Sequence, residues 1–394
     1  MFRFAVGLVV LLGHPAWAEV DQGPPNVPHF TPAFENQTRA PEIGEKVSLK
    51  VDVLAEGLEH PWGVAPLPEG GYLVTERVGR LVHVGADGSV SEVRGVPEVV
   101  AKRQGGLLDV ALALDFASSR RIYLTYSKPR GWRKSATALA TGVLAEDFDR
   151  IDGTQDIFIQ SPSSSSPLHY GSRVLLREGE IFVTLGEHST PNERVLAQDL
   201  RTTFGKVVRI LPDGDIPADN PFVGQPDARG EIWSYGHRNP QGAAFHPVTG
   251  DLWTLEHGPA GGDELNRIEP GANYGWPIVS YGENYVGTPI GSGQSSAPGI
   301  VEPRYYWDPV IAPGGFTFYD GDLFDWQGDV LAGSLNPGGI VRLTLEGDRV
   351  TGEARYLEDQ GRVRDVDVDH DGALLLLIDA SDGRLLRITP RTDG

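Results

Sequence analysis

Six short strand-like segments recur along the chain, and this repeat constrains the fold more than any other feature. Each segment is built from β-branched, leucine or aromatic residues and follows a turn rich in Gly, Asp or Pro. Successive segments begin 44 to 78 residues apart. They are residues 72–75, 122–125, 181–184, 252–255, 330–333 and 374–377. Repeats of about this period are typical of propellers and solenoids, in which one repeat is one supersecondary unit.

The repeat predicts an all-β fold, a six-bladed β-propeller that forms one domain over residues 46–394. The irregular spacing places the longest insertions between the second and fifth copies, where we expect long inter-blade loops to form the active site on one face. Residues 47–53 then pair with the last blade and close the ring. A β-sandwich or a two-domain β protein is the alternative, because length alone does not decide the number of domains.

Composition supports many turns and excludes several classes of function. The 394 residues include 50 Gly and 30 Pro, spread along the chain, as expected for short strands joined by turns. The formal net charge of −20 excludes a generic binder of nucleic acid, because its field repels phosphate. The chain has no Cys, which excludes disulfides, thiol catalysis and cysteine-ligated metal centres.

The N-terminus has the pattern of a secretory signal peptide over residues 1–18. Arg3 precedes a short apolar stretch, and Ala16 and Ala18 supply the small residues of a cleavage site, so we expect cleavage before Glu19. The apolar run is too short to span a bilayer, and no later stretch is suited to membrane insertion. We therefore predict a periplasmic protein, whose proline-rich residues 19–45 form an extended lead-in to the propeller.

Polar residues gather in three predicted loops within about forty residues of one another. Residues 236–242, 256–266 and 273–277 bring together a guanidinium group, amides, carboxylates and backbone carbonyls freed by Gly and Pro. Hard oxygen donors on irregular backbone suit calcium, which imposes no strict geometry. A well-capped surface loop is the alternative for such a stretch.

Two further features can carry chemistry. His169 lies where a serine-rich loop meets a predicted strand, a position suited to a general base near neutral pH or to a purely structural histidine. Strand alternation in residues 361–365 puts Arg362 and Arg364 on one face, where they can hold an anionic ligand together. The alternative is an exposed pair beside Asp365 and Asp367.

Taken in order along the chain, these stretches resemble the soluble pyrroloquinoline-quinone-dependent aldose sugar dehydrogenases, relatives of the soluble quinoprotein glucose dehydrogenase. The resemblance covers nearly the whole mature chain, and the joint order of the pieces is more specific than any one piece. The matching stretches are residues 58–63, 104–109, 169–173, 197–206, 237–241, 256–259, 273–277 and 361–365. The family fold is a six-bladed propeller.

The resemblance implies catalytic roles for two residues. His169 matches the base that takes the proton of the sugar C1 hydroxyl while hydride passes to the quinone, and Arg238 matches the arginine that stabilises charge on the quinone oxygen. His169 and Arg238 are therefore also predicted cofactor contacts. The remaining predicted cofactor contacts are Gln104, Asp109, Asn239, Tyr285, Asn336, Arg362 and Arg364.

The same resemblance implies calcium. The backbone carbonyls of Gly258 and Pro259 match ligands of a calcium ion that polarises the cofactor, and Glu264 with Tyr274 matches a further calcium site. The chain also departs from the family pattern. Asn336 stands where the family usually has a cofactor-contacting lysine, and Glu187-His188 stands where the family has Asp-Arg. Losing one cation is expected to weaken cofactor binding by about 1 to 3 kcal/mol.

The leading hypothesis is thus a periplasmic quinoprotein, monomeric or homodimeric, that oxidises aldose sugars at C1 to lactones and passes electrons to an unidentified acceptor. A calcium-dependent propeller hydrolase acting on lactones or esters is one alternative, although it has no use for the paired arginines. A non-catalytic propeller that binds glycan or protein is the other. Fold alone supports all three.

Overall fold

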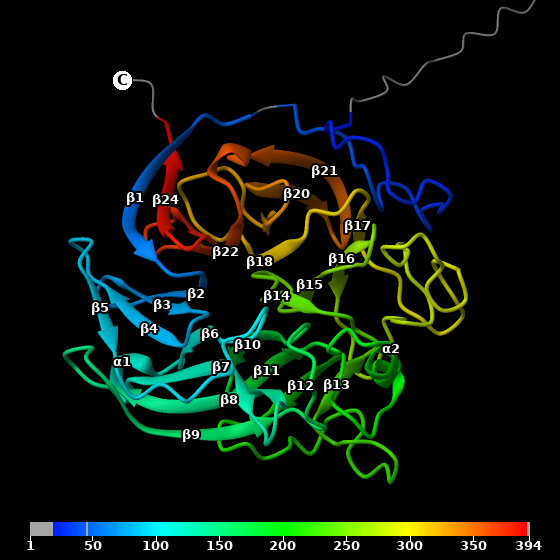
Figure 1. Cartoon of the computed structure of the whole chain (residues 1–394). Coiled ribbons are helices and arrows are strands. Elements are labelled where there is room, and N and C mark those ends of the chain that lie inside the picture. The colour runs from blue at the N-terminus through cyan, green and yellow to red at the C-terminus, as the bar shows by residue number, and fades with distance from the viewer. Residues whose placement is uncertain (1–18, 45, 392–394) are drawn as a thin grey trace, which may run out of the picture.

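The computed structural model describes residues 19–44 and 46–391 and shows six four-stranded sheets arranged around a central axis, a six-bladed β-propeller (Figure 1). Within each sheet, neighbouring strands are antiparallel. The first three sheets, from the inner strand outward, are β2–β5 (Pro61–Pro66, Tyr72–Glu76, Arg80–Val84, Val90–Val93), β6–β9 (Leu107–Leu112, Arg121–Pro129, Ser135–Leu144, Ile151–Ile159) and β10–β13 (Gly171–Arg177, Glu180–Leu185, Lys206–Ile210, Ile232–Tyr235).

The other three sheets complete the ring. They are β14–β17 (Pro240–Phe245, Leu252–Glu256, Asp263–Arg267, Tyr305–Trp307), β18–β21 (Pro313–Phe318, Val330–Ser334, Ile340–Glu346, Arg349–Tyr356), and β22–β24 with β1 (Val363–Val368, Leu374–Ile378, Gly383–Pro390, Leu49–Leu58). Helical elements in the described residues are short: α1 (Phe116–Ser119), α2 (Pro191–Arg194), η1 (Val195–Gln198) and η2 (Glu358–Gln360). The predicted fold class is confirmed.

The six predicted segments occupy equivalent positions. Each one falls in the second strand of its sheet, namely β3, β7, β11, β15, β19 and β23. Ring closure also follows the prediction, because β1 near the N-terminus pairs with β24, from Leu49 opposite Pro390 to Leu58 opposite Gly383. The last sheet therefore combines both ends of the chain.

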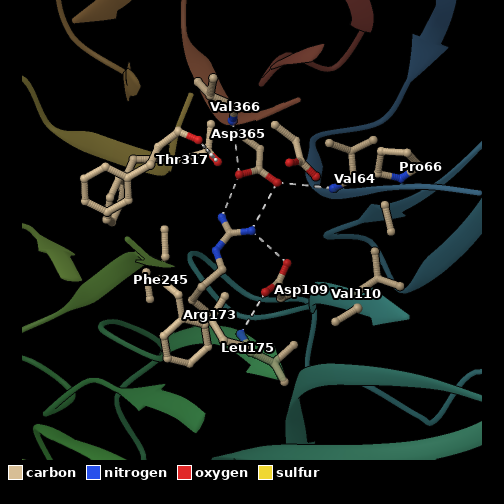
Figure 2. Close-up of a pocket in the computed structure, with 18 of the residues that line it drawn as sticks. Val64, Pro66, Asp109, Val110, Arg173, Leu175, Phe245, Thr317, Asp365 and Val366 are labelled. Atoms are coloured by element: carbon tan, nitrogen blue, oxygen red, sulfur yellow. Dashed lines mark hydrogen bonds and ion pairs between the residues drawn. The ribbon is translucent and has the colours of Figure 1, made fainter. Parts of the chain in front are cut away.

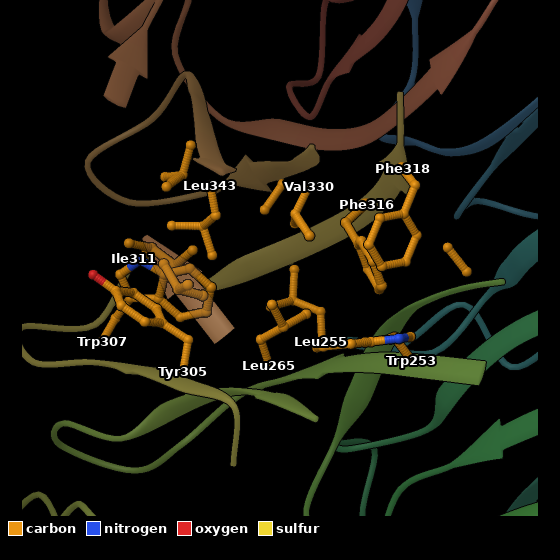
Figure 3. Close-up of a cluster of buried hydrophobic side chains, with 14 of the residues drawn as sticks. Trp253, Leu255, Leu265, Tyr305, Trp307, Ile311, Phe316, Phe318, Val330 and Leu343 are labelled. Carbon is orange, nitrogen blue, oxygen red and sulfur yellow. The ribbon is translucent and has the colours of Figure 1, made fainter. Parts of the chain in front are cut away.

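Both faces of each sheet are covered by neighbouring sheets, so the second strands are apolar on both sides. All five residues of β23, Leu374–Ile378, are buried. Figure 3 shows the packing between the fourth and fifth sheets, where Trp253 and Leu255 meet Phe316, Phe318 and Val330. Burial on both faces favours continuous β-branched and leucine runs over alternation, which is the pattern that marked these strands in the sequence.

The lead-in, residues 19–44, contains isolated bridges and no helix or strand. It follows the outer edges of the fourth and fifth sheets: Glu42 bridges to Glu353 of β21 and the Asp308 carboxylate accepts the backbone N–H groups of Asn26 and Val27 at 2.6 and 2.9 Å. The predicted signal peptide, residues 1–18, lies outside the described residues.

The inner strands enclose a channel, and three charged side chains fill it at one level. The third residues of the six inner strands, in order, are Gly63, Asp109, Arg173, Gly242, Gly315 and Asp365. Arg173 donates from Nη1 to Asp109 Oδ1 at 2.8 Å and from Nη2 to Asp365 Oδ1 at 2.9 Å (Figure 2). A Cβ atom on Gly63 would lie 2.6 Å from Asp109 Oδ1, and one on Gly315 would overlap Asp365. Glycine at these positions makes room for the three charged side chains, which we call the channel cluster.

Candidate active site

Strand direction gathers the predicted site residues on one face. Because neighbouring strands are antiparallel, the connection into each inner strand and the connection between each second and third strand emerge at the same end of the blade. We call this end the upper face. The residues that these connections carry are Gln104, His169, Glu187, Arg238, Asn239, Gly258, Pro259, Asn336, Arg362 and Asp379.

His169 and Glu187 form a buried pair. The Nδ1 atom of His169 lies 3.2 Å from Glu187 Oε1, and the two residues are 6% and 0% exposed. Burial and the nearby Arg238 lower the pKa of His169 below its ordinary value. Burial alone would raise the pKa of Glu187, but the His169 hydrogen bond and the charges of His169 and Arg238 lower it. At neutral pH the pair is therefore a neutral imidazole held by a carboxylate, which is the form that a base needs.

Two predicted cofactor contacts hold the backbone around His169. Gln104 Oε1 accepts the N–H of His169 at 2.7 Å, and Asn239 Oδ1 accepts the N–H of Gly171 at 3.1 Å. His169 itself has a positive φ of 47°, which a residue with a side chain adopts only when its surroundings impose it. Both amide side chains thus use their oxygens internally, and their NH₂ groups are the ends that can donate to a ligand.

Arg238 lies beside this pair in a largely closed environment. Its Nη1 atom donates to the carbonyl of His257 at 3.0 Å, and its guanidinium carbon lies 5.2 Å from the centre of the Trp276 ring. Trp276 also donates its indole N–H to Glu187 Oε1 at 3.1 Å, which connects Arg238 to the histidine pair. The Nε atom of Arg238 is buried and has no hydrogen-bond partner in the described part of the chain. An unsatisfied buried donor is costly unless a ligand accepts from it.

Arg362 and Arg364 meet at one carboxylate, as the prediction of a shared face requires. Their Nη2 atoms lie 3.5 and 3.1 Å from Asp379 Oδ2. Burial opposes ionisation of Asp379, yet Arg364 and Arg77 hold its pKa well below the usual range. The Nε atom of Arg364 is buried without a partner among residues 19–44 and 46–391. The alternative, an exposed pair beside Asp365 and Asp367, does not describe this contact, because the carboxylate between the two arginines is Asp379 and Arg364 is buried.

Gln241 joins the arginine pair to the neighbouring loop. Its Oε1 atom accepts from Arg364 Nη1 at 2.8 Å and lies 3.0 Å from His257 Nε2. Burial, Arg364 and Arg238 lower the pKa of His257 far below its ordinary value, because cations lie on both sides of it. Gln241 and His257 therefore lie between the guanidinium groups of Arg238 and Arg364.

The four predicted calcium ligands line one cavity. Gly258, Pro259, Glu264 and Tyr274 surround it together with Arg238. Asn266 Nδ2 donates to both Glu256 Oε1 and Glu264 Oε2, at 3.1 and 3.2 Å, so these carboxylates lie close together. Burial and Glu256 raise the pKa of Glu264 well above its ordinary value.

Asp263 holds the loop that carries two of these predicted ligands. Its Oδ1 atom accepts the N–H of Gly258 at 2.7 Å, and its Oδ2 atom accepts the N–H groups of Ile311 and Ala312 at 2.8 and 2.7 Å. No group of three or more His, Cys, Asp or Glu side chains in the described residues is arranged to hold a metal ion. A calcium site here would therefore combine backbone carbonyls with at most two such side chains.

Three predicted contacts are placed differently from the rest, and their roles stay predictions. Asp109 belongs to the channel cluster, where one oxygen accepts from Arg173 and the other from the N–H of Val174. The Tyr274 hydroxyl donates to the carbonyl of Arg267 and accepts from the N–H of Glu269, which leaves only its backbone carbonyl for a cation. Tyr285 is 78% exposed and makes no hydrogen bond with the other predicted residues.

Asn336 is exposed and follows Leu335, whose carbonyl accepts Arg362 Nη1 at 3.1 Å. The Arg362 guanidinium therefore contacts the backbone next to Asn336, the residue that stands where the family usually has a lysine. The sequence analysis missed Glu187 as the partner of His169, noting it only as a departure from the family pattern. Asp379 was not predicted either, and it meets the arginines because β22 and β23 pair with Val363 opposite Ile378.

The sequence of this chain is similar to those of known sugar dehydrogenases. Residues 58–387 match the family model described as Glucose / Sorbosone dehydrogenase. The chain belongs to this family. It is 43% identical over 350 residues to Aldose sugar dehydrogenase YliI of Escherichia coli K12, which covers 87% of this chain and 94% of that protein. It is 28% identical to Quinoprotein glucose dehydrogenase B of Acinetobacter calcoaceticus, covering 84% of this chain and 86% of that protein.

Solved structures agree with this family assignment. The apo form of the soluble aldose sugar dehydrogenase of Escherichia coli superposes with a TM-score of 0.84 at 43% identity, covering 87% of this chain and all of that one. The PQQ-bound aldose sugar dehydrogenase of Streptomyces coelicolor gives a TM-score of 0.73 at 28% identity, covering 88% and 99%. These relatives are named sugar dehydrogenases, which supports the assignment of this chain as an oxidoreductase that acts on sugars.

None of the helices in the described residues is both long enough and apolar enough to cross a membrane.

Proposed function

We propose that this protein oxidises aldose sugars at C1 to the lactone, using bound pyrroloquinoline quinone and calcium. The observation that carries the proposal is the arrangement on the upper face: a buried histidine held by a carboxylate lies beside arginines whose buried Nε atoms lack partners among the described residues. The names of the relatives supply the substrate class and the cofactor.

The residues on the upper face fit an anionic quinone. Arg238 and Arg364 each present a buried Nε donor with no acceptor in the described part of the chain, and the amide groups of Gln104 and Asn239 add further donors to the upper face. Arg362 is more exposed than Arg364, and its Nη1 atom donates to the carbonyl of Leu335, next to Asn336. These are the charge-assisted donors that carboxylates and quinone oxygens require. Pyrroloquinoline quinone, when bound, supplies the acceptor for the hydride.

The cavity beside Arg238 fits a calcium ion. Gly258 and Pro259 contribute backbone to its wall, and the Glu256 and Glu264 carboxylates share the amide nitrogen of Asn266. The Oδ1 atom of Asn266 is buried without a donor in the described part of the chain. An excess of oxygen acceptors with too few donors is compensated by a hard cation.

The chain's own groups then perform four tasks. The neutral His169 imidazole accepts the proton of the sugar C1 hydroxyl at Nε2, because Nδ1 faces Glu187. Glu187 fixes this tautomer and stabilises the imidazolium that forms. Arg238 stabilises negative charge that develops at the reacting end of the cofactor. Gln104 and Asn239 hold the His169 backbone in place.

Secretion to the periplasm is part of the proposal and rests on the pattern of residues 1–18 alone. Sugars in that compartment have direct access to an upper face on the surface of the propeller, and the electrons leave through an external acceptor.

The test is dye-linked oxidation of an aldose panel by the mature protein with pyrroloquinoline quinone and calcium added. Wild-type protein is expected to turn over aldoses only when both are present. His169→Ala is expected to keep cofactor binding and lose at least about a hundredfold in turnover. The matched control is His370→Ala, because His370 is exposed and lies in a turn outside the site. Ordinary turnover by His169→Ala would refute its role as the base, and turnover of lactones without cofactor would favour a hydrolase.

A further inference from the structure

A basic groove lies beside the candidate active site. Its walls come from the hairpin loop between β7 and β8 and from the connections into β6 and β10, and its volume of about 480 Å³ is that of a small-ligand site. Lys102, Arg133 and Lys134 line it, and Trp132 at the tip of the hairpin is 82% exposed. We call this the basic groove.

The cations of the basic groove are not neutralised by the chain. Lys102, Arg133 and Lys134 are exposed and take part in no ion pair among residues 19–44 and 46–391, although the chain has 54 acidic residues against 34 basic ones. By contrast, Lys128 on the same hairpin pairs with Asp156 at 2.8 Å. Unpaired cations concentrated in one groove of an acidic protein attract anions to that groove.

The basic groove and the candidate active site share two connections of the chain, those into β6 and β10. Lys102 and Pro167 line the groove, and each lies two residues from a site residue: Lys102 from Gln104 and Pro167 from His169. The backbone N–H of Gln104 donates to the carbonyl of Pro167 at 3.1 Å, so the two connections are in contact. The groove therefore lies on the upper face, beside the segments that carry Gln104 and His169.

We propose that the basic groove is a subsite for the anionic, distal sugar of an oligosaccharide whose reducing end is oxidised at His169. The proposal rests on the proposed function for the reducing end. Arg133 and Lys134 bind the carboxylate or sulfate group, and the exposed Trp132 ring packs against an apolar sugar face. The preferred substrate class is thus an acidic oligosaccharide with a neutral reducing aldose.

Groove shape favours a saccharide over a protein partner. A concave groove beside the segment that carries His169 accommodates a saccharide ring, whereas a docking face for an acidic redox protein needs no such concavity. The guanidinium carbon of Arg133 lies 4.6 Å from the centre of the Trp132 ring. One face of the ring therefore packs against the guanidinium, and the other face can pack against a ligand.

The experiment compares an aldobiouronic acid, in which a uronic acid is joined to a neutral reducing hexose, with the neutral disaccharide of the same linkage. We expect kcat/KM for the acidic disaccharide to exceed that for the neutral one by about tenfold at low salt. Salt at 0.5 M and the double variant Arg133→Ala/Lys134→Ala should each bring this ratio towards one. Lys50→Ala/Arg391→Ala, which removes two exposed cations from the last blade, should leave the ratio unchanged.

A binding measurement separates this inference from the proposed function. The cofactor-free protein is titrated with the same two disaccharides while tryptophan fluorescence is recorded, with Trp132→Ala as the variant that loses the signal. Selective binding of the acidic disaccharide without oxidation of any aldose would support the groove and refute the proposed function. Aldose oxidation with equal affinity for both disaccharides would refute the groove alone. A slower reaction of the double variant with an acidic cytochrome c, but not with a dye, at an unchanged ratio would assign the groove to protein docking and overturn the inference.

Discussion

Two clusters of buried charge lie next to each other in this propeller and differ in how they are satisfied. In the channel cluster, Arg173 uses Nε, Nη1 and Nη2 as donors, to the Gln241 carbonyl, to Asp109 and to Asp365. On the upper face, Arg238 and Arg364 each keep a buried Nε atom without a partner in the described residues. One cluster is complete within the chain and the other is incomplete.

The difference distinguishes a cluster whose donors are all used from one that can still donate to a ligand, a feature that Arg77, Arg194, Arg209 and Arg304 share at their Nε atoms within the described residues. A buried arginine whose donors all reach carboxylates and carbonyls stabilises the contacts between blades, and its removal leaves uncompensated charge. A buried arginine with a free donor has the group that an anionic ligand requires. Residue type alone does not distinguish the two cases, because both clusters pair Arg with Asp.

The largest effect is expected from Arg173→Met, which leaves Asp109 and Asp365 buried without their cation. We expect the free energy of unfolding to fall by about 3–5 kcal/mol, measured by thermal or denaturant unfolding. Adding Asp109→Asn and Asp365→Asn should recover much of the loss, because the neutral triplet carries no unpaired charge. A single Arg173→Met variant as stable as wild type would contradict the structural role of the channel cluster.

Glu187→Gln is expected to lower turnover by about a hundredfold, because the amide no longer stabilises the imidazolium of His169. The pH dependence of kcat distinguishes this role of Glu187 from a purely structural one. Glu187 raises the pKa of His169, so its removal should shift the acidic limb of kcat to lower pH. A loss of turnover with an unmoved limb would point to a general structural defect. Glu193→Gln, which changes an acid of the next short helix, is the control.

Arg364→Met is expected to weaken binding of pyrroloquinoline quinone about tenfold or more, as loss of a charge-assisted hydrogen bond should. The melting temperature of the cofactor-free protein should fall far less than in Arg173→Met, since Arg364 is incompletely satisfied. Spectroscopic titration and thermal unfolding measure the two quantities. Equal destabilisation by the two arginine variants would remove the distinction between the clusters.

The smallest effect is expected from Asp367→Asn in the channel. Burial and Asp365 raise the pKa of Asp367 to about 7, above its unfolded value of 3.8. The folded state therefore binds more protons than the unfolded state between these values, and stability falls as pH rises from about 4 to 7. Asp367→Asn should raise the melting temperature by about 1–3 °C at pH 8 and leave it unchanged below pH 4. Destabilisation at pH 8 would contradict this account.

Much of the fold was predictable because the blade repeats. Residues 374–377 and the five related segments are apolar on both faces, a pattern that burial between two sheets imposes. The channel cluster was predictable in principle from the same repeat: Asp109, Arg173 and Asp365 occupy the third position of their inner strands, opposite glycines in the other three. The family resemblance named Asp109 as a cofactor contact, a role that stays a prediction beside its place in the channel cluster.

The candidate site was only partly predictable from the sequence. His169 and Arg238 were singled out by type, position and family resemblance, and the fold brings them together with Trp276 between them. The contact of Gln241 with Arg364 was not predicted because it joins residues more than a hundred positions apart, whereas Asp379 meets Arg362 and Arg364 through the pairing of β22 with β23 in one sheet. Such contacts leave no local pattern in one sequence.

The most direct test is anaerobic titration of the mature wild-type protein and of Arg238→Met with pyrroloquinoline quinone, with and without calcium, followed by absorption spectroscopy. The account predicts one cofactor per wild-type chain, bound at micromolar concentration only when calcium is present, and binding at least about tenfold weaker in Arg238→Met at nearly unchanged melting temperature. No binding by the wild type, or binding indifferent to Arg238, would contradict the claim that the incomplete charge cluster of the upper face is the cofactor site.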